Sequence, residues 1–220
     1  MLAATPPGFG GSPVPAGFDY SVESYAALVE QLIQQEGVDA LVAHSYFANV
    51  AIEVAARGWF GGRLMLLSPC LRRENEEADV RRLDRVSGVP VVRSVVWAIV
   101  YAGMKSSMRE RLPAARLDAL VAEMRRNSAR ADRQILRGTF AHLDRCGNLG
   151  NRLIASARPA WVVRGERDEI GLLSEDETRL REAGRIELRT IPDAAHFAFV
   201  EQPRAVAVLI GELLDGAAEG

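Results

Sequence analysis

Three short apolar runs, set between helical patterns, constrain the fold of this chain more than any other feature. They cover Ala40–His44, Arg63–Ser68 and Pro159–Arg164, and they do not alternate between apolar and polar residues. Continuous apolar runs of this length are typical of parallel strands that are covered on both faces of a sheet. A fourth run, Ile186–Ile191, alternates more, so we expect it near a sheet edge. The pattern predicts an α/β fold with a mostly parallel sheet and flanking helices.

Helical patterns lie before, between and after these strands. One apolar stripe at helical spacing precedes the first strand, and another follows Pro203, a residue suited to the first turn of a helix. Between residues 71 and 158 we find helical stripes and no convincing strand. We therefore expect three parts: residues 1–70 as the first part of an α/β core, 71–158 as a helical insertion that forms a lid, and 159–220 as the second part of the core.

The composition argues against several classes of protein. A formal net charge of −2 gives no electrostatic reason to expect nucleic acid or a membrane surface as a partner. The longest apolar run, Val89–Met104, contains Arg93 and is shorter than the roughly 20 residues of a membrane span, so we expect a buried or lid helix. Cys70 and Cys146 fit no disulfide framework, which favours reduced thiols in a cytoplasmic protein. The N-terminus lacks the basic and apolar segments of a signal peptide.

Ser45 stands at a sharp corner between a strand and a helix. The apolar run ends at His44, and a nearly all-apolar helical pattern starts directly after Ser45 and reaches Gly58. Such a corner strains the backbone of its middle residue, projects the side chain outward and places it at the positive end of the helix dipole. A serine in this position is either a nucleophile or a residue of a tight turn, and the corner alone does not decide between them.

A serine nucleophile needs a base, and the chain has three histidines. His44 should point away from its neighbour Ser45, and His142, on a helical pattern, should pack within the lid or lie on the surface. His196 follows the last strand in a loop of small residues, at the same end of the sheet as Ser45. Asp168, just beyond the preceding strand, could orient the imidazole of His196. Taken singly, Asp168 could instead cap a turn and His196 could hydrogen-bond within its loop.

Four stretches resemble the motifs of the α/β-hydrolase superfamily, of the lidded esterase and C–C-hydrolase type, and the resemblance covers residues 5–214. PGFGGSP resembles the loop after the fourth strand of that family, AHSYFA its nucleophile elbow, VVRGERDEI its acid loop and IPDAAHFAFVEQP its histidine loop. By matching position, the resemblance implies that Ser45 is the nucleophile, Asp168 the acid and His196 the base, in the chain order of that family. It also implies that the N–H of Tyr46 is one oxyanion-hole donor.

Two departures from the family pattern concern the elbow and the N-terminus. Phe47 stands where the family has a second small residue, and we expect its ring to turn into the pocket rather than push the helix away. The family also places several strands and a His-Gly oxyanion loop before the PGFG loop, and this chain begins just before that loop. A gene start set too far downstream, a fragment or a rearranged sheet would each explain this, and we favour a truncated version of a longer enzyme.

The resemblance favours acyl transfer to water through an acyl-enzyme, in which His196 takes the proton of Ser45 and then activates water. The expected partner is a small, fairly apolar substrate with an ester, thioester or related acyl bond, and Phe47, Trp97 and Met104 could line its pocket. Serine at the elbow disfavours the family members that use aspartate, the dehalogenases and epoxide hydrolases. We expect no cofactor and no metal ion, since the histidines and cysteines lack metal-ligand spacing. The alternative is a catalytically impaired or non-catalytic binding module of the same fold.

Overall fold

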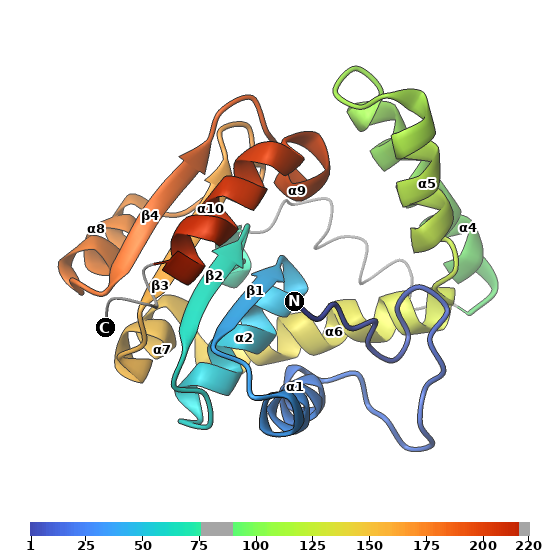
Figure 1. Cartoon of the computed structure of the whole chain (residues 1–220). Coiled ribbons are helices and arrows are strands. Elements are labelled where there is room, and N and C mark those ends of the chain that lie inside the picture. Colours follow the sequence, from blue (N-terminus) through green and yellow to red (C-terminus); the bar gives the residue numbers. More distant parts are fainter. Residues whose placement is uncertain (76–89, 216–220) are drawn as a thin grey trace. The chain divides into compact units, whose positions relative to one another are not determined.

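The chain forms two compact units, and the computed structural model describes residues 1–75 and 90–215 (Figure 1). One unit comprises Met1–Ser21 and Ala78–Phe140, and the other comprises Val22–Glu77 and Ala141–Gly220. The sheet belongs entirely to the second unit, which we call the sheet unit, whereas the first unit, which we call the helical unit, is built from loops and helices.

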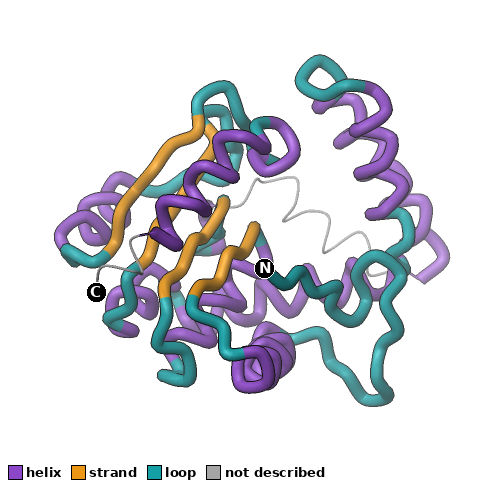
Figure 2. The backbone as a smooth tube through the Cα atoms, in the orientation of Figure 1, coloured by secondary structure: helices purple, strands orange, loops and turns teal. Residues whose placement is uncertain are grey.

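The sheet unit contains four parallel strands in the order β1-β2-β3-β4 (Figure 1 and Figure 2). Their bounds are Ala40–His44 (β1), Arg63–Leu67 (β2), Ala160–Gly165 (β3) and Ile186–Ile191 (β4). The strands coincide with the four runs in the sequence, which confirms the predicted α/β fold with a parallel sheet. Since every strand runs in the same direction, the carboxyl ends of all four strands lie at the same end of the sheet. The loops at this end are expected to carry functional residues.

Helices cover both faces of this sheet (Figure 1). On one face α10 (Pro203–Asp215) packs its Val206 and Leu213 into a buried apolar cluster with Met65, Leu67 and other strand residues. On the other face α2 (Tyr46–Ala56) contacts β1 and β2, and α1 (Val22–Glu36) and α7 (Leu149–Ser156) pack against α2. Helix α8 (Ser174–Glu182) contacts β4 and α7, and the short α9 (Ala198–Glu201) precedes α10. The position of Pro203 at the start of α10 agrees with the sequence pattern.

β1 lies at one edge of the described sheet, and the prediction that it is covered on both faces is wrong. The side chain of Val42 is 42% exposed, whereas Leu64, Met65 and Leu66 of the neighbouring β2 are buried. An apolar run indicates a strand, but it does not tell an edge strand from a central one, because the missing neighbour leaves no local trace in the sequence. β4 forms the opposite edge, as its alternating pattern predicts.

Between β2 and β3 the described residues form only helices. They are η1 (Arg73–Asn75), α4 (Pro90–Met108), α5 (Ala114–Met124), α6 (Ala129–Cys146) and α7. Inside the helical unit the hydroxyl of Tyr101 donates a hydrogen bond to Asp132, which also accepts one from the side-chain amide of Asn127 at 2.9 Å. The function of this segment as a lid stays a prediction, and its residues 76–89 lie outside the described part. Among the helices described, none has the length and apolar character needed to cross a bilayer.

Candidate active site

Ser45 is the single residue between β1 and α2. Its backbone has φ 53° and ψ −120°, and a positive φ is uncommon for any residue other than glycine. Backbone hydrogen bonds on both sides hold it there. The N–H of Ser45 donates to the carbonyl of Leu67 at 2.8 Å, and the carbonyl of Ser45 accepts from the N–H of Ala48 at 2.9 Å. The strand ladder and the first helical turn thus meet at Ser45, in a conformation that costs on the order of 1–3 kcal/mol.

Ser45, His196 and Asp168 form a continuous hydrogen-bonded chain. The hydroxyl of Ser45 lies 3.0 Å from Nε2 of His196, and Nδ1 of the same ring lies 3.1 Å from Oδ1 of Asp168. The carboxylate can only accept, so Nδ1 carries the proton and Nε2 is left to accept the proton of the Ser45 hydroxyl. The structure therefore brings together three residues from the ends of three different strands, all within the sheet unit.

Burial and hydrogen bonding shift the pKa of Asp168 in opposite directions. The side chain of this residue is 1% exposed. Burial alone raises the pKa of this carboxyl, but the hydrogen bond from His196, the charge of that ring and the N–H of Ile170 at 3.1 Å together hold the pKa below its ordinary value. Asp168 is thus ionised at neutral pH. An ionised carboxylate in this place orients the imidazole and stabilises a positive charge on it.

The loop that carries His196 runs across the carboxyl ends of the strands. It starts at β4, one outer strand of the sheet, and reaches Ser45, which follows β1, the opposite outer strand. Gly165, at the end of β3, makes the crossing possible, because a Cβ there would come within 2.4 Å of the carbonyl oxygens of Ala194 and Ala195. The N–H of Arg167 also donates to the carbonyl of Ala194 at 2.8 Å. The glycine that precedes the acid loop in the sequence thus allows the backbone of the histidine loop to approach closely.

The aromatic residues after Ser45 pack toward helix α1. Tyr46 is the first residue of α2, so its N–H belongs to the positive end of that helix. The ring of Phe47 lies 5.4 Å from that of Tyr25 on α1 and 5.3 Å from that of Tyr46, both in edge-to-face geometry. These contacts place Phe47 in an aromatic cluster with the buried Tyr25, and its contribution to a substrate pocket stays a prediction.

The other candidate residues take no part in this chain of hydrogen bonds. Trp97 and Met104 are on α4 in the helical unit, where the ring of Trp97 lies 6.1 Å from that of Tyr101. Their role as pocket residues therefore stays a prediction. Cys70 is buried, and its thiol donates to the carbonyl of Arg72 at 3.1 Å. In the part of the chain that the structure describes, no group of three or more His, Cys, Asp or Glu could hold a metal ion.

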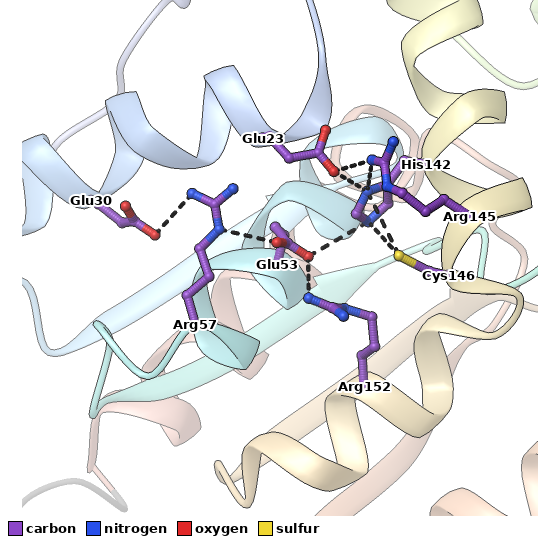
Figure 3. A network of polar contacts seen from close by, with 8 residues as sticks. All are labelled: Glu23, Glu30, Glu53, Arg57, His142, Arg145, Cys146 and Arg152. Carbon is purple, nitrogen blue, oxygen red and sulfur yellow. Dashed lines mark hydrogen bonds and ion pairs between the residues drawn. The ribbon is translucent and has the colours of Figure 1, made fainter.

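Sequence reasoning missed the partners of the other two histidines. For His44 this partner is the main chain of His196, whose carbonyl oxygen lies 2.7 Å from Nε2 of His44. His142 is neither a surface residue nor a simple packing residue, since its Nδ1 donates to Glu23 at 2.8 Å and its Nε2 lies 3.8 Å from Glu53 (Figure 3). The spacing of His142 and Cys146, one helical turn apart on α6, was the only local signal for this second cluster.

Comparison with known proteins identifies the family. The model of the alpha/beta hydrolase family matches residues 2–209, and the chain belongs to this family. Hydrolysis is thus the general activity that the family supports. A search of curated proteins found no match.

Solved structures share the fold at low sequence identity. A thermophilic esterase from Thermogutta terrifontis has a TM-score of 0.72 at 23% identity, over 95% of this chain and 77% of that one. A structure from a study of carboxylesterases of the thaumarchaeon Nitrososphaera gargenis has a TM-score of 0.67 at 16% identity, over 98% and 79% of the two chains. The N-acyl homoserine lactonase AidH has a TM-score of 0.69 at 20% identity, over 94% and 75%.

Proposed function

We propose that this protein is a serine hydrolase that cleaves an ester, thioester or related acyl bond of a small, fairly apolar substrate. The observation that carries the proposal is the hydrogen-bonded chain from the Ser45 hydroxyl through His196 to the buried carboxylate of Asp168. A serine hydroxyl is a weak nucleophile unless a positioned base takes its proton, and this arrangement supplies both the base and its orienting acid.

The first half of the reaction forms an acyl-enzyme. Oγ of Ser45 attacks the acyl carbon while Nε2 of His196 takes the hydroxyl proton, and the ionised Asp168 stabilises the resulting imidazolium. Negative charge develops on the acyl oxygen at the N-terminal end of α2. There the N–H of Tyr46 and the helix dipole can stabilise it. The imidazolium then gives its proton to the leaving group, and the bond between the acyl carbon and the leaving group breaks.

The second half returns the enzyme to its starting state. Nε2 of His196 takes a proton from water, the hydroxide attacks the acyl-enzyme, and Ser45 leaves with the proton from the imidazolium. The side chain of His196 is 19% exposed, so part of it is in contact with water, whereas its acid partner is buried. This combination suits a base that must exchange protons with an incoming water molecule.

The compared structures favour carboxylic esters as the substrate class. Two come from an esterase and from a study of carboxylesterases, and the third is a lactonase in complex with N-hexanoyl homoserine, which carries a short apolar acyl chain. A lactone is a cyclic ester, so all three names describe the same kind of bond. For this chain we therefore expect p-nitrophenyl esters of short and medium acyl chains to serve as test substrates.

Labelling with a fluorophosphonate probe tests the proposal. The probe should attach to Ser45 in the 220-residue chain, and Ser45→Ala should abolish both labelling and ester hydrolysis. Ser107→Ala, at an exposed serine of the helical unit, is the matched control and should label like the wild type. Equal labelling of the Ser45→Ala variant, or ligand binding without any turnover by the wild type, would support the impaired binding module instead.

A further inference from the structure

We propose that His44 is a positioning residue, whose ring holds the main chain of His196 and so sets the distance from the base to Ser45. The inference rests on the serine-hydrolase function proposed above. It is carried by a contact between side chain and main chain, since Nε2 of His44 lies 2.7 Å from the carbonyl oxygen of His196. A carbonyl only accepts hydrogen bonds, so Nε2 of His44 carries the proton and donates it.

The crossing loop explains why such a contact is needed. The N–H of Arg167 donates to the carbonyl of Ala194, and the N–H of Ala195 donates to the carboxylate of Glu201 at 3.0 Å, but neither bond holds the carbonyl of His196. In the described part of the chain, two side chains contact the carbonyl oxygen of His196. His44 donates at 2.7 Å, and the hydroxyl of Ser68, after β2, donates over a longer 3.4 Å. His44 thus makes the shorter contact at the end of the loop that faces β1.

The place of His44 in the chain makes this contact unusually direct. His44 is the last residue of β1 and is covalently bonded to Ser45. The end of β1 therefore provides both His44, which holds the main chain of His196, and, directly after it, the proposed nucleophile Ser45. A shift of the histidine loop relative to β1 would change the distance of 3.0 Å between Nε2 of His196 and Oγ of Ser45.

The charge state of His44 is compatible with this role. Partial burial and the charge of His196 lower the pKa of His44 to about 3, so its ring is neutral at the neutral pH where Asp168 is ionised. The two imidazoles lie 4.8 Å apart between centroids. A charged ring at His44 would oppose the imidazolium that His196 must form during catalysis, whereas a neutral ring can donate a hydrogen bond without that repulsion.

A competing explanation is that His44 only fills space. Its ring lies 5.5 Å from that of Phe197 and 4.8 Å from that of Phe199, so it belongs to an aromatic cluster beside the site. Two substitutions separate packing from hydrogen bonding. His44→Phe keeps a ring of similar size but removes the donor, whereas His44→Gln loses the ring but keeps an N–H that can reach the same carbonyl.

The experiment measures kcat and KM for p-nitrophenyl ester hydrolysis, with active sites counted by fluorophosphonate labelling. For His44→Phe we expect kcat per labelled site to fall about 10²-fold with little change in KM, because a base displaced by a fraction of an ångström loses its alignment. His44→Gln should recover most of that loss. Thermal unfolding of both variants shows whether they are folded.

Three outcomes would overturn the inference: equal loss in His44→Gln and His44→Phe, wild-type kcat in His44→Phe, or a loss confined to KM. Each of these requires an active wild type, so none can be mistaken for failure of the proposed function. If the wild type itself neither labels nor hydrolyses esters, the serine-hydrolase proposal fails and takes this inference with it.

Discussion

Two clusters of polar side chains lie near the two ends of helix α2. They contain similar kinds of residue but differ in their surroundings. At its N-terminal end, His196 lies between the hydroxyl of Ser45 and the carboxylate of Asp168. Near its C-terminal end, His142 lies 2.8 Å from a carboxylate oxygen of Glu23, and the thiol of Cys146 lies 3.8 and 3.9 Å from its two nitrogens. Each cluster contains a histidine, an acid and an atom that could act as a nucleophile.

The surroundings of the two histidines differ. His142 is 1% exposed, and its second nitrogen faces another carboxylate, that of Glu53, at 3.8 Å (Figure 3). Arg152 pairs with Glu53 at 2.6 Å, and Arg145 pairs with Glu23. His196 instead has one carboxylate and one neutral hydroxyl, and part of its ring is exposed. The same residue types thus build a closed network of ion pairs in one place and an open chain for proton transfer in the other.

The comparison indicates that the role of a histidine depends on the group that faces its second ring nitrogen. A ring between two carboxylates is held at both ends, and the arginines around it balance the buried charge, which is a structural arrangement. A ring with a carboxylate on one nitrogen and a hydroxyl on the other can accept a proton and pass it on. His142 should therefore matter for stability, and His196 for turnover.

Replacing the two histidines in turn tests this division most strongly. His196→Ala should lower kcat/KM by about 10⁴-fold or more, because it removes the base that takes the proton of Ser45. His142→Ala should leave kcat per labelled site near the wild-type value and lower the free energy of unfolding by about 1–3 kcal/mol, because it removes a buried ring and its hydrogen bond to Glu23. Ester hydrolysis and urea denaturation measure the two effects. The reverse pattern would show that the clusters have been assigned the wrong roles.

The acids of the two clusters can be compared in the same way. Asp168→Asn should lower kcat by about 10³–10⁴-fold, because an amide at this place no longer selects the tautomer with a proton on Nδ1 of His196. Glu23→Gln, which neutralises the corresponding acid beside His142, is the matched control and should leave kcat within about twofold. Single-turnover measurements of acyl-enzyme formation would place the loss in the chemical step. Similar losses in both variants would contradict the comparison.

Gly165→Ala tests the path of the histidine loop. The added Cβ would meet the backbone carbonyls of Ala194 and Ala195, which cannot move like a flexible side chain, so we expect a loss of about 1–3 kcal/mol in stability. We also expect kcat to fall about tenfold or more as His196 is displaced. Gly171→Ala is the control, because no atom lies within 4 Å of the added Cβ there. Urea denaturation and steady-state kinetics of the two variants give the answer.

Local patterns in the sequence account for the four strands, the helix that begins at Pro203 and the positions of the candidate triad. Each of these depends on a short stretch: an apolar run, a proline before a stripe, or a polar residue just past a strand. The position of β4 at a sheet edge also followed from its alternating pattern, but the exposure of β1 did not follow from its apolar run. Its exposure depends on its outer position in the sheet. The apolar residues Leu41, Val42 and Ala43 would suit an outer strand and a central strand equally well.

The contacts that sequence reasoning missed all join distant residues. His44 meets the carbonyl of His196, 152 positions away, only because the histidine loop crosses the sheet above Gly165. His142, near the end of α6, meets Glu23, near the start of α1, across 119 positions. Gly165 was visible in the acid-loop motif, and a glycine directly after a buried strand could have indicated the close approach of another backbone.

Lowering the pH should weaken the open cluster through Asp168. The pKa of this carboxyl is held below its ordinary value in the folded protein, so its contribution to stability is present above that ordinary value and is lost as the pH falls through the lowered one. Asp168→Asn should therefore lose less stability than the wild type between pH 6 and 3. Urea denaturation across that range measures the difference. A parallel loss in both proteins would show that Asp168 is not stabilised as an anion.

The smallest effect is expected for Cys146→Ser, which tests whether the second cluster has any chemistry of its own. Burial raises the pKa of the Cys146 thiol, so the group is protonated at neutral pH and cannot act as a thiolate nucleophile. We expect wild-type kcat, a change in stability below about 1 kcal/mol, and slow reaction of the wild-type thiol with iodoacetamide. If Cys146→Ser instead abolished ester hydrolysis while Ser45→Ala retained it, the nucleophile would lie in the closed cluster.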